Sequence, residues 1–179
     1  MLLGTESDFL QSAALKFTDH DVVICGTFAG DDVRAIKQVR PNAHVVVVDS
    51  FLGLAKPSFE DTSQETVQAG ECNIGGVEKY KSYFKNKSEL PDEIYQMWIT
   101  PENLMIVKSR PISILFLDLD HYQPTKVCLD YFKFMLVNKS VIIVHDYGFH
   151  RCPGVKIACE QFGGTWTGVP GCTFGVQIK

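Results

Sequence analysis

Four short apolar runs constrain the fold of this sequence more than any other feature. They occupy residues 22–25, 45–48, 112–117 and 141–144, and the residues directly after them are Gly26, Asp49, Asp118 and His145. Continuous runs of valine, isoleucine and leucine of this length are typical of strands that are buried on both faces, as in a parallel sheet. We therefore expect a buried and mostly parallel sheet at the centre of the fold.

Segments with helical spacing of apolar residues lie between these runs. We expect helices over residues 31–40, 76–87 and 125–137, and one more strand over residues 95–100. Strands that alternate with helices predict a doubly wound α/β sheet.

The end of the chain breaks this alternation. A helix is expected over residues 154–162, and two strand-like segments follow at 165–169 and 173–178 with the turn signal Pro170-Gly171 between them. Strands this close in sequence pair only as an antiparallel hairpin. A mostly parallel, Rossmann-like sheet that ends in such a hairpin is typical of class I methyltransferases, and this is the fold class that we expect.

Composition narrows the organisation and the partners. The 179 residues predict a single domain over 1–179, in which 1–20 form a short helical lead-in and 55–75 a lid loop. The net charge of −4, without a basic run, argues against nucleic acid as a partner. Six cysteines without a CxxC pair fit a reducing compartment, and we find neither a signal peptide nor a membrane-spanning run, so the expected location is cytoplasmic.

The turn after the first run is a candidate cofactor-binding element. It contains Gly26, Thr27, Phe28 and Gly30. In open α/β sheets a ligand lies outside the carboxyl ends of the strands, near such a turn, although two glycines can also serve only to tighten it. The turn lacks the third glycine of the dinucleotide fingerprint, and Asp31 and Asp32 at the helix start disfavour a pyrophosphate there. These features favour a sulfonium cofactor over NAD.

Asp49 is the second candidate. An acid at the end of the second strand, about 20 residues past the glycine turn, can accept hydrogen bonds from ribose hydroxyls. The alternative is a turn or helix-capping aspartate. Together with the glycine turn, the ribose interpretation is favoured.

Polar residues at the ends of the last two runs form the most informative pattern. Asp118 and Asp120 follow one run, and His145 and Asp146 follow the next. If these strands are neighbours, their ends lie about 5 Å apart. Carboxylates that close require a shared proton, a cation or a catalytic division of labour. Oxygen ligands suit Mg²⁺ and an added imidazole favours Mn²⁺, Fe²⁺ or Zn²⁺, whereas the alternative is a set of loop caps and surface ion pairs.

Other reactive or aromatic side chains near these motifs are expected to have structural positions. We interpret His121, His150 and Cys152 as loop residues, because their spacing does not match a zinc site. Trp98 is expected to pack in the core or at the sheet edge rather than to contact a substrate.

Motifs from these regions recur in the order of a known family. They are D-S-F-L-G-L at residues 49–54, Asp61, L-D-L-D-H-Y-Q-P-T at residues 117–125 and D-Y-G at residues 146–148. The sequence thereby resembles the macrocin O-methyltransferase (TylF-like) family, which methylates sugar hydroxyls on macrolides and related glycosides. The resemblance covers most of the chain from Val22 onward.

The resemblance implies S-adenosylmethionine and a divalent cation as cofactors, Mg²⁺ or, because of His145, Mn²⁺. It implies that Asp118 and Asp146 ligate the metal and that His145 stands where the family has another metal-binding aspartate. Asp120 is then the general base. The implied cofactor-binding residues are Gly26, Thr27, Phe28, Gly30, Asp49, Ser50, Phe51 and Asp118.

The expected function is therefore metal-assisted methylation of a sugar or glycoside hydroxyl. Metal coordination lowers the pKa of the hydroxyl, Asp120 accepts its proton and the oxygen attacks the methyl group. The sequence departs from the family at Ile24, where an acid is common, and at His145. Two alternatives stay open: a catalytically degenerate cofactor-binding module and an NAD-linked oxidoreductase. The expected partner is a small-molecule or glycan hydroxyl acceptor, with neither membrane nor nucleic acid, and a homodimer is considered.

Overall fold

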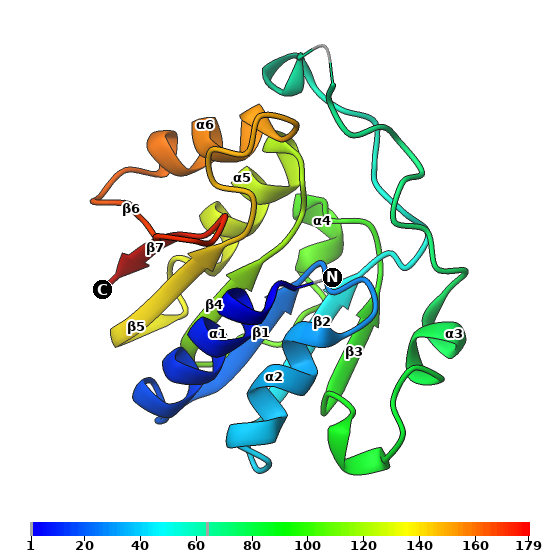
Figure 1. The fold of residues 1–179 in the computed structure, drawn as a ribbon, viewed down its shortest axis with the longest axis vertical. Helices are drawn as coiled ribbons and strands as arrows, with labels where there is room; N and C mark the ends of the chain where they lie inside the picture. The colour runs from blue at the N-terminus through cyan, green and yellow to red at the C-terminus, as the bar shows by residue number, and fades with distance from the viewer. Residues whose placement is uncertain (1, 64) are drawn as a thin grey trace.

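The computed structural model of the chain describes residues 2–63 and 65–179. Strands and helices alternate along most of it (Figure 1). The helices are α1 (Gly4–Lys16), α2 (Asp31–Val39), η1 (Phe59–Asp61), α3 (Val77–Lys81), η2 (Lys87–Glu89), α4 (Pro101–Leu104), α5 (Tyr122–Phe132) and α6 (Pro153–Phe162). The strands are β1 (Asp21–Cys25), β2 (Val45–Asp49), β3 (Glu93–Gln96), β4 (Ile112–Leu117), β5 (Leu136–Val144), β6 (Thr167–Gly168) and β7 (Gly175–Ile178).

The strands described form one seven-stranded sheet in the order β3-β2-β1-β4-β5-β7-β6. The first five of these pair in parallel, whereas β7 is antiparallel to both β5 and β6. The predicted fold class, a Rossmann-like parallel sheet closed by an antiparallel hairpin, is confirmed. Because the strand order reverses between β1 and β4, their carboxyl ends flank the position where ligands bind in sheets of this kind.

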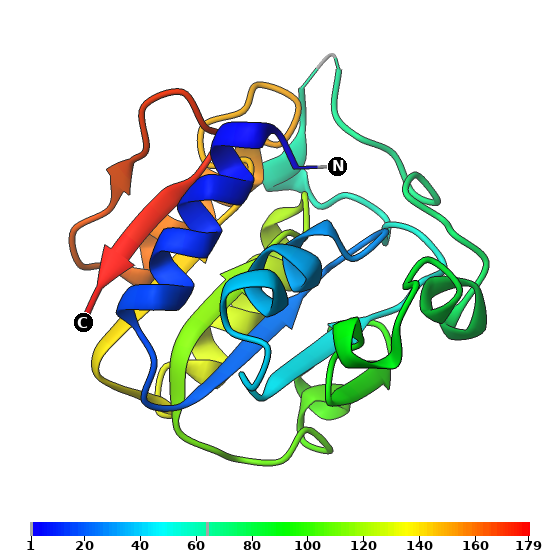
Figure 2. The ribbon, with the colours of Figure 1, turned by 60° about the horizontal axis from the view of Figure 1, so that its bottom comes forward.

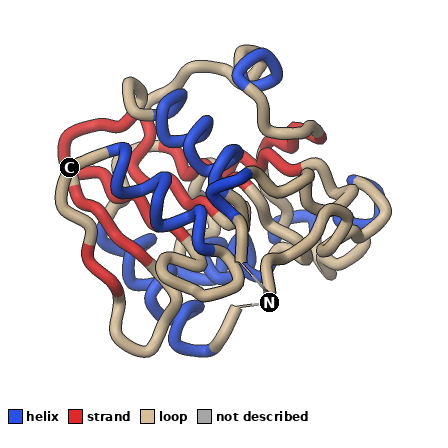
Figure 3. Tube along the Cα trace, turned by 90° about the horizontal axis from the view of Figure 1, so that it is seen from above, coloured by secondary structure: helices blue, strands red, loops and turns tan. Residues whose placement is uncertain are grey.

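Helices cover both faces of the sheet. Side chains of β1 alternate: Val22 and Ile24 pack on the side of α1 and α2, whereas Val23 and Cys25 pack on the side of α4, α5 and α6. Figures 1 and 2 show the two helical layers, and Figure 3 shows helices, strands and the long loops between them from above. Among the described residues, we find no helix with the length and apolar character needed to cross a membrane.

Three predicted element boundaries are wrong. The strand expected at 95–100 is β3, which begins at Glu93 and ends at Gln96, because the cap that Thr100 provides to Asn103 starts α4 close behind it. The helix expected at 125–137 ends at Phe132, because Leu136 already pairs with Ile112 in the sheet.

The helix expected at 76–87 is the third difference. It is reduced to α3, which ends at Lys81. The Ser82 hydroxyl donates to the carbonyl of Lys79 at 2.6 Å, a local bond that competes with helix continuation.

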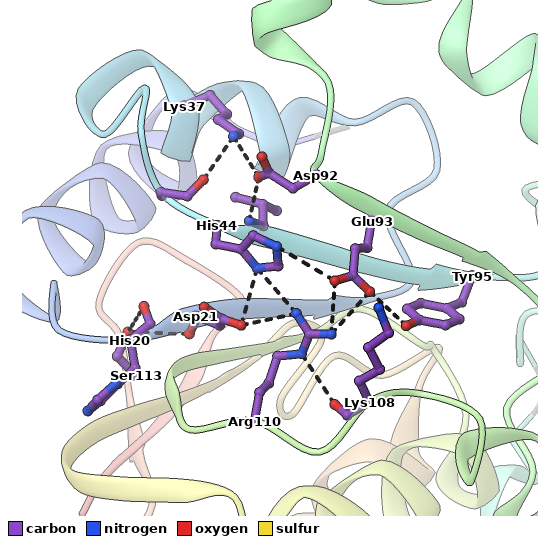
Figure 4. A network of polar contacts seen from close by, with 12 residues as sticks. His20, Asp21, Lys37, His44, Asp92, Glu93, Tyr95, Lys108, Arg110 and Ser113 are labelled. Carbon is purple, nitrogen blue, oxygen red and sulfur yellow. Dashed lines mark hydrogen bonds and ion pairs between the residues drawn. The ribbon is translucent and has the colours of Figure 1, made fainter.

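Charged residues join the amino ends of four neighbouring strands (Figure 4). Arg110, just before β4, donates to both carboxylate oxygens of Glu93 in β3 at 3.0 Å and to Asp21 in β1 at 3.1 Å. His44, just before β2, lies 3.2 Å from the same Asp21 oxygen. We call these four residues the amino-end network. Its bidentate arginine fixes the strand ends in register.

Candidate active site

A cavity of about 350 Å³ lies at the carboxyl ends of the parallel strands. Nine residues predicted from the sequence line it: Gly26, Thr27, Phe28, Asp49, Ser50, Asp118, Asp120, His145 and Asp146. The remaining wall consists of Gly53, Leu54, Ala55, Lys56, Cys72, Met97, Trp98, Ile99, Thr100, Leu119, Gln123 and Pro124. The residues that directly follow the four apolar runs thus meet in one place.

Two predicted cofactor-binding residues, Gly30 and Phe51, lie outside this cavity wall. Gly30 precedes α2 with φ +80°, and a Cβ there would lie 2.4 Å from the ring of Phe84. The Phe51 side chain is buried and stacks on Tyr80 with ring centroids 4.6 Å apart. Both residues pack against aromatic side chains next to the cavity, at Phe84 and Tyr80.

Gly26 allows the β1–α2 turn to pass directly over the end of β4. Its φ is +78°, and a Cβ at this position would lie 1.8 Å from the carbonyl oxygen of Asp118. The turn is held at its other side by Thr27, whose amide donates to Asp49 Oδ2 at 2.8 Å. The backbone of the turn is thereby fixed close to the cavity, where only glycine fits at the crossing point.

The two acids at the start of α2 have partners within the protein. Asp32 is only 3% exposed and accepts a hydrogen bond from the Thr27 hydroxyl at 2.6 Å. Burial raises the pKa of Asp32 to about 8, even though this hydrogen bond and one from the Val33 amide lower it. Asp31 pairs with Arg34. Neither acid lines the cavity, although both lie in the first turn of α2.

Asp49 presents its carboxylate at the end of β2. Oδ2 accepts from Thr27, and Oδ1 accepts from the amide of Phe51 at 2.6 Å. Burial raises the pKa of Asp49, and these amide hydrogen bonds act in the opposite direction. Because each carboxylate oxygen has further acceptor capacity, Asp49 can still accept from two neighbouring hydroxyl groups in the cavity.

Asp118, His145 and Asp146 converge at the ends of β4 and β5. The pairing of Leu117 with Val144 makes Asp118 and His145 neighbours across the sheet. His145 Nδ1 lies 3.1 Å from Asp118 Oδ1 and 3.0 Å from Asp146 Oδ2. Burial lowers the pKa of His145, but the two carboxylates outweigh it and raise the pKa to about 11.

This group of three side chains fits a divalent cation. Nδ1 of His145 is buried and has no hydrogen-bond partner of good geometry, although two carboxylate oxygens lie close to it. Ligand atoms at right angles around an ion, with bonds of about 2.1 Å, are about 3.0 Å apart, which matches both distances. Two oxygens and one nitrogen suit Mn²⁺ or a similar ion as well as Mg²⁺.

Asp120 belongs to a second, overlapping group with Asp146 and Cys152. The Cys152 thiol donates to Asp120 Oδ1 at 3.7 Å. Burial raises the pKa of Asp120 to about 8, with further contributions from Asp118 and Asp146. Cys152 lies in the loop directly before α6, as expected, and its side chain is buried there.

Described residues on either side of position 64, in the predicted lid, contact the helices next to the cavity. The buried Asp61 accepts from the amide of Tyr122, at the start of α5, at 2.7 Å, and from the Ser58 amide and hydroxyl at 2.8 Å. His121 Nε2 lies 3.0 Å from the carbonyl oxygen of Val67. His121 lies in the loop directly before α5, as expected, and its buried side chain joins the two segments.

Sequence reasoning missed the apolar wall that follows β3. It consists of Met97, Trp98, Ile99 and Thr100. Trp98, expected to pack in the core or at the sheet edge, is 40% exposed and lines the cavity. The signal was available, because β3 is a further parallel strand and its carboxyl end lies at the same edge as the others. Because the predicted strand extended to Thr100, these residues were expected inside the sheet and not at its end.

Comparisons with known proteins find likenesses in structure alone. No family model matches the chain, and no curated protein matches it. The calicheamicin methyltransferase CalS11 superposes with a TM-score of 0.77 at 18% identity, over 97% of this chain and 77% of CalS11. The O-methyltransferase NovP gives 0.79 at 17% identity, over 97% and 78%. An O-methyltransferase from Bacillus cereus in complex with SAH gives 0.59 at 12% identity, over 100% and 83%.

These likenesses establish the fold. The strand order, the parallel core and the antiparallel end of the sheet are those of class I methyltransferases, as the sequence predicted. CalS11 is also described as a TDP-rhamnose 3′-O-methyltransferase.

Proposed function

We propose that this chain is an S-adenosylmethionine-dependent O-methyltransferase of the macrocin type, which uses a divalent cation to methylate a sugar or glycoside hydroxyl. One observation carries the proposal: the Asp49 carboxylate and glycine turn share a cavity with the Asp118, His145 and Asp146 group. Asp49 and the glycine turn suit a nucleoside, whereas the two carboxylates and the imidazole suit a cation. The descriptions of CalS11 as a sugar O-methyltransferase and of the Bacillus cereus structure as a SAH complex support the same assignment.

The cofactor side of the cavity is formed by β1, β2 and β3. Asp49 accepts hydrogen bonds from the ribose hydroxyls, and the backbone at Gly26 and Thr27 approaches the methionine end. Met97 and Trp98 provide an apolar surface for the adenine ring. When bound, the sulfonium cofactor supplies the electrophilic methyl group.

The acceptor side is formed by the ends of β4 and β5. Asp118, His145 and Asp146 would hold the cation, which supplies Lewis acidity that lowers the pKa of the acceptor hydroxyl. Asp120 lines the same cavity and accepts the hydroxyl proton at its carboxylate. The raised pKa of Asp120, about 8, suits this role, because a general base works best when its pKa lies near the working pH. Positioning of the two reactants by the rigid strand ends supplies much of the remaining rate.

A second candidate, a catalytically degenerate binding module, is favoured by one observation. The His145 imidazole lies between two carboxylates and its pKa is raised to about 11, so in its protonated form it neutralises part of their charge without a metal. Such a protein would bind the cofactor and transfer no methyl group.

The proposal is tested by calorimetric titration with S-adenosylmethionine, SAH and NAD, followed by incubation with a panel of nucleotide sugars and glycosides. We expect micromolar binding of the first two, and an added methyl group on at least one acceptor by mass spectrometry, with Mg²⁺ or Mn²⁺ present. Asp49→Ala should abolish cofactor binding, whereas the control Asp31→Asn, outside the cavity, should not. Binding of NAD instead, or binding without transfer across the panel, would favour the alternatives.

A further inference from the structure

Glu6 is a buried carboxylate that the proposed mechanism does not use. It lies in the first turn of α1 and is only 1% exposed. Oε2 accepts from the amide of Leu3 at 2.9 Å, and Oε1 accepts from the hydroxyl and amide of Thr173 at 2.9 and 3.3 Å. These bonds fix the carboxylate between α1 and the β6–β7 connection, and Figure 2 shows α1 beside β7.

The same carboxylate faces the proposed cation site from behind. Oε1 of Glu6 lies 3.5 Å from Nε2 of His145. The opposite ring nitrogen, Nδ1, is the one that lies next to Asp118 and Asp146. The edge-on contact with Phe174, at 5.5 Å between ring centroids, restricts rotation of the imidazole. One nitrogen thus faces the proposed ligand group and the other faces a fixed acceptor.

We propose that Glu6 is a positioning residue that holds His145 with its proton on Nε2, so that the lone pair of Nδ1 points at the cation held by Asp118 and Asp146. This inference rests on the cation of the proposed function. Histidine ligands commonly donate their second N–H to a carboxylate, which selects the tautomer and strengthens the nitrogen as a ligand. Helix α1, 139 positions earlier in the sequence, thereby becomes part of the site.

The role predicts a graded response to substitution. Glu6→Gln retains an oxygen acceptor of similar position but loses the negative charge, whereas Glu6→Ala removes the acceptor. We expect Mn²⁺ affinity to fall about tenfold in the first and up to about 100-fold in the second. The matched control Thr173→Val removes one hydrogen bond to Glu6 and leaves its carboxylate beside His145, so Mn²⁺ affinity should change less than in either variant.

The experiment is calorimetric titration of Mn²⁺ into the wild type and the three variants, with metal-free SAH binding as a check on the fold. A second measurement uses the wild type alone: long-range ¹H–¹⁵N correlation spectra of the Zn²⁺-loaded protein, in which His145 should be metal-bound at Nδ1 and protonated at Nε2. Wild-type Mn²⁺ affinity in Glu6→Ala, or metal at Nε2, would overturn this inference alone. A wild type that binds SAH but neither ion would overturn both this inference and the cation of the proposed function.

Discussion

The two ends of the parallel sheet treat charge in opposite ways. At the amino end, Arg110 pairs with Glu93 and Asp21, and each carboxylate has a cationic partner within the protein (Figure 4). At the carboxyl end, Asp118 and Asp146 converge with a single imidazole between them. The first arrangement satisfies its charges and joins strands. The second leaves charge that a bound cation could neutralise, and this difference supports the proposed site at the carboxyl end.

Backbone conformation separates the two ends in the same way. Of six non-glycine residues with positive φ in the described part of the chain, four line the cavity: Phe28, Cys72, Asp120 and Asp146. Such conformations cost about 1–3 kcal/mol each and persist where the surrounding structure enforces them, often at functional sites. None of the four residues of the amino-end network has one.

The largest expected effect is the loss of transfer in Asp120→Asn. An amide cannot accept the hydroxyl proton, so methyl transfer should fall by about 10²–10⁴-fold. Cofactor affinity should be nearly unchanged, because Asp120 lies on the acceptor side. Steady-state transfer assays with parallel SAH titrations measure both, with Asp31→Asn as control. Normal turnover in Asp120→Asn would show that the base is another group.

Gly26→Ala tests whether the fold requires the backbone at Gly26 to pass close to the backbone at Asp118. The Cβ would clash with the Asp118 carbonyl oxygen and also require φ +78°, so the free energy of unfolding should fall by about 3 kcal/mol or more. Gly148→Ala is the matched control, since φ is +83° there and nothing lies within 4 Å of the added atom. It should cost only about 1 kcal/mol. If both variants lose the same free energy of unfolding in urea titrations, the predicted clash at Gly26 does not occur.

Arg110→Met tests the amino end. The Arg110 side chain is 12% exposed, and its removal leaves Glu93 and Asp21 without their main partner. The free energy of unfolding should fall by about 2 kcal/mol, because uncompensated, partly buried carboxylates are costly. Affinity for SAH should stay at the wild-type level. A variant that keeps its stability but loses cofactor binding would contradict the division between the two ends.

The last effect has the opposite sign: Asp120→Asn should stabilise the metal-free protein at alkaline pH. The folded-state pKa of Asp120 is raised to about 8 from 3.8, so the proton is held more tightly in the folded state. The associated stability is complete below pH 3.8 and is lost as pH rises through about 8. The variant should therefore gain stability relative to wild type as pH rises from 5 towards 8, by about 1.4 kcal/mol for each pH unit. Thermal unfolding in the presence of a chelator measures it, and a pH-independent difference would argue against the raised pKa.

Sequence reasoning located the strand ends well because buried parallel strands are continuous apolar runs. The polar residue that ends each run, as at Asp49 and Asp118, then falls at the cavity edge by geometry alone. Sequence reasoning failed where the position of a side chain depends on contacts between residues far apart in the sequence. Glu6 reaches His145 only because α1 packs beside the terminal hairpin, and burial of Asp32 depends on how the glycine turn folds over it. Neither contact leaves a local pattern.

Our main proposal is that Asp118, His145 and Asp146 together hold a divalent cation beside the cofactor. A crystal structure of the protein grown with SAH and Mn²⁺, with anomalous data collected at the manganese edge, tests it most directly. We expect one strong anomalous peak bonded to Asp118, His145 Nδ1 and Asp146, with the SAH ribose on Asp49. SAH in place with the His145 ring still directly between the two carboxylates, and no peak there, would contradict it.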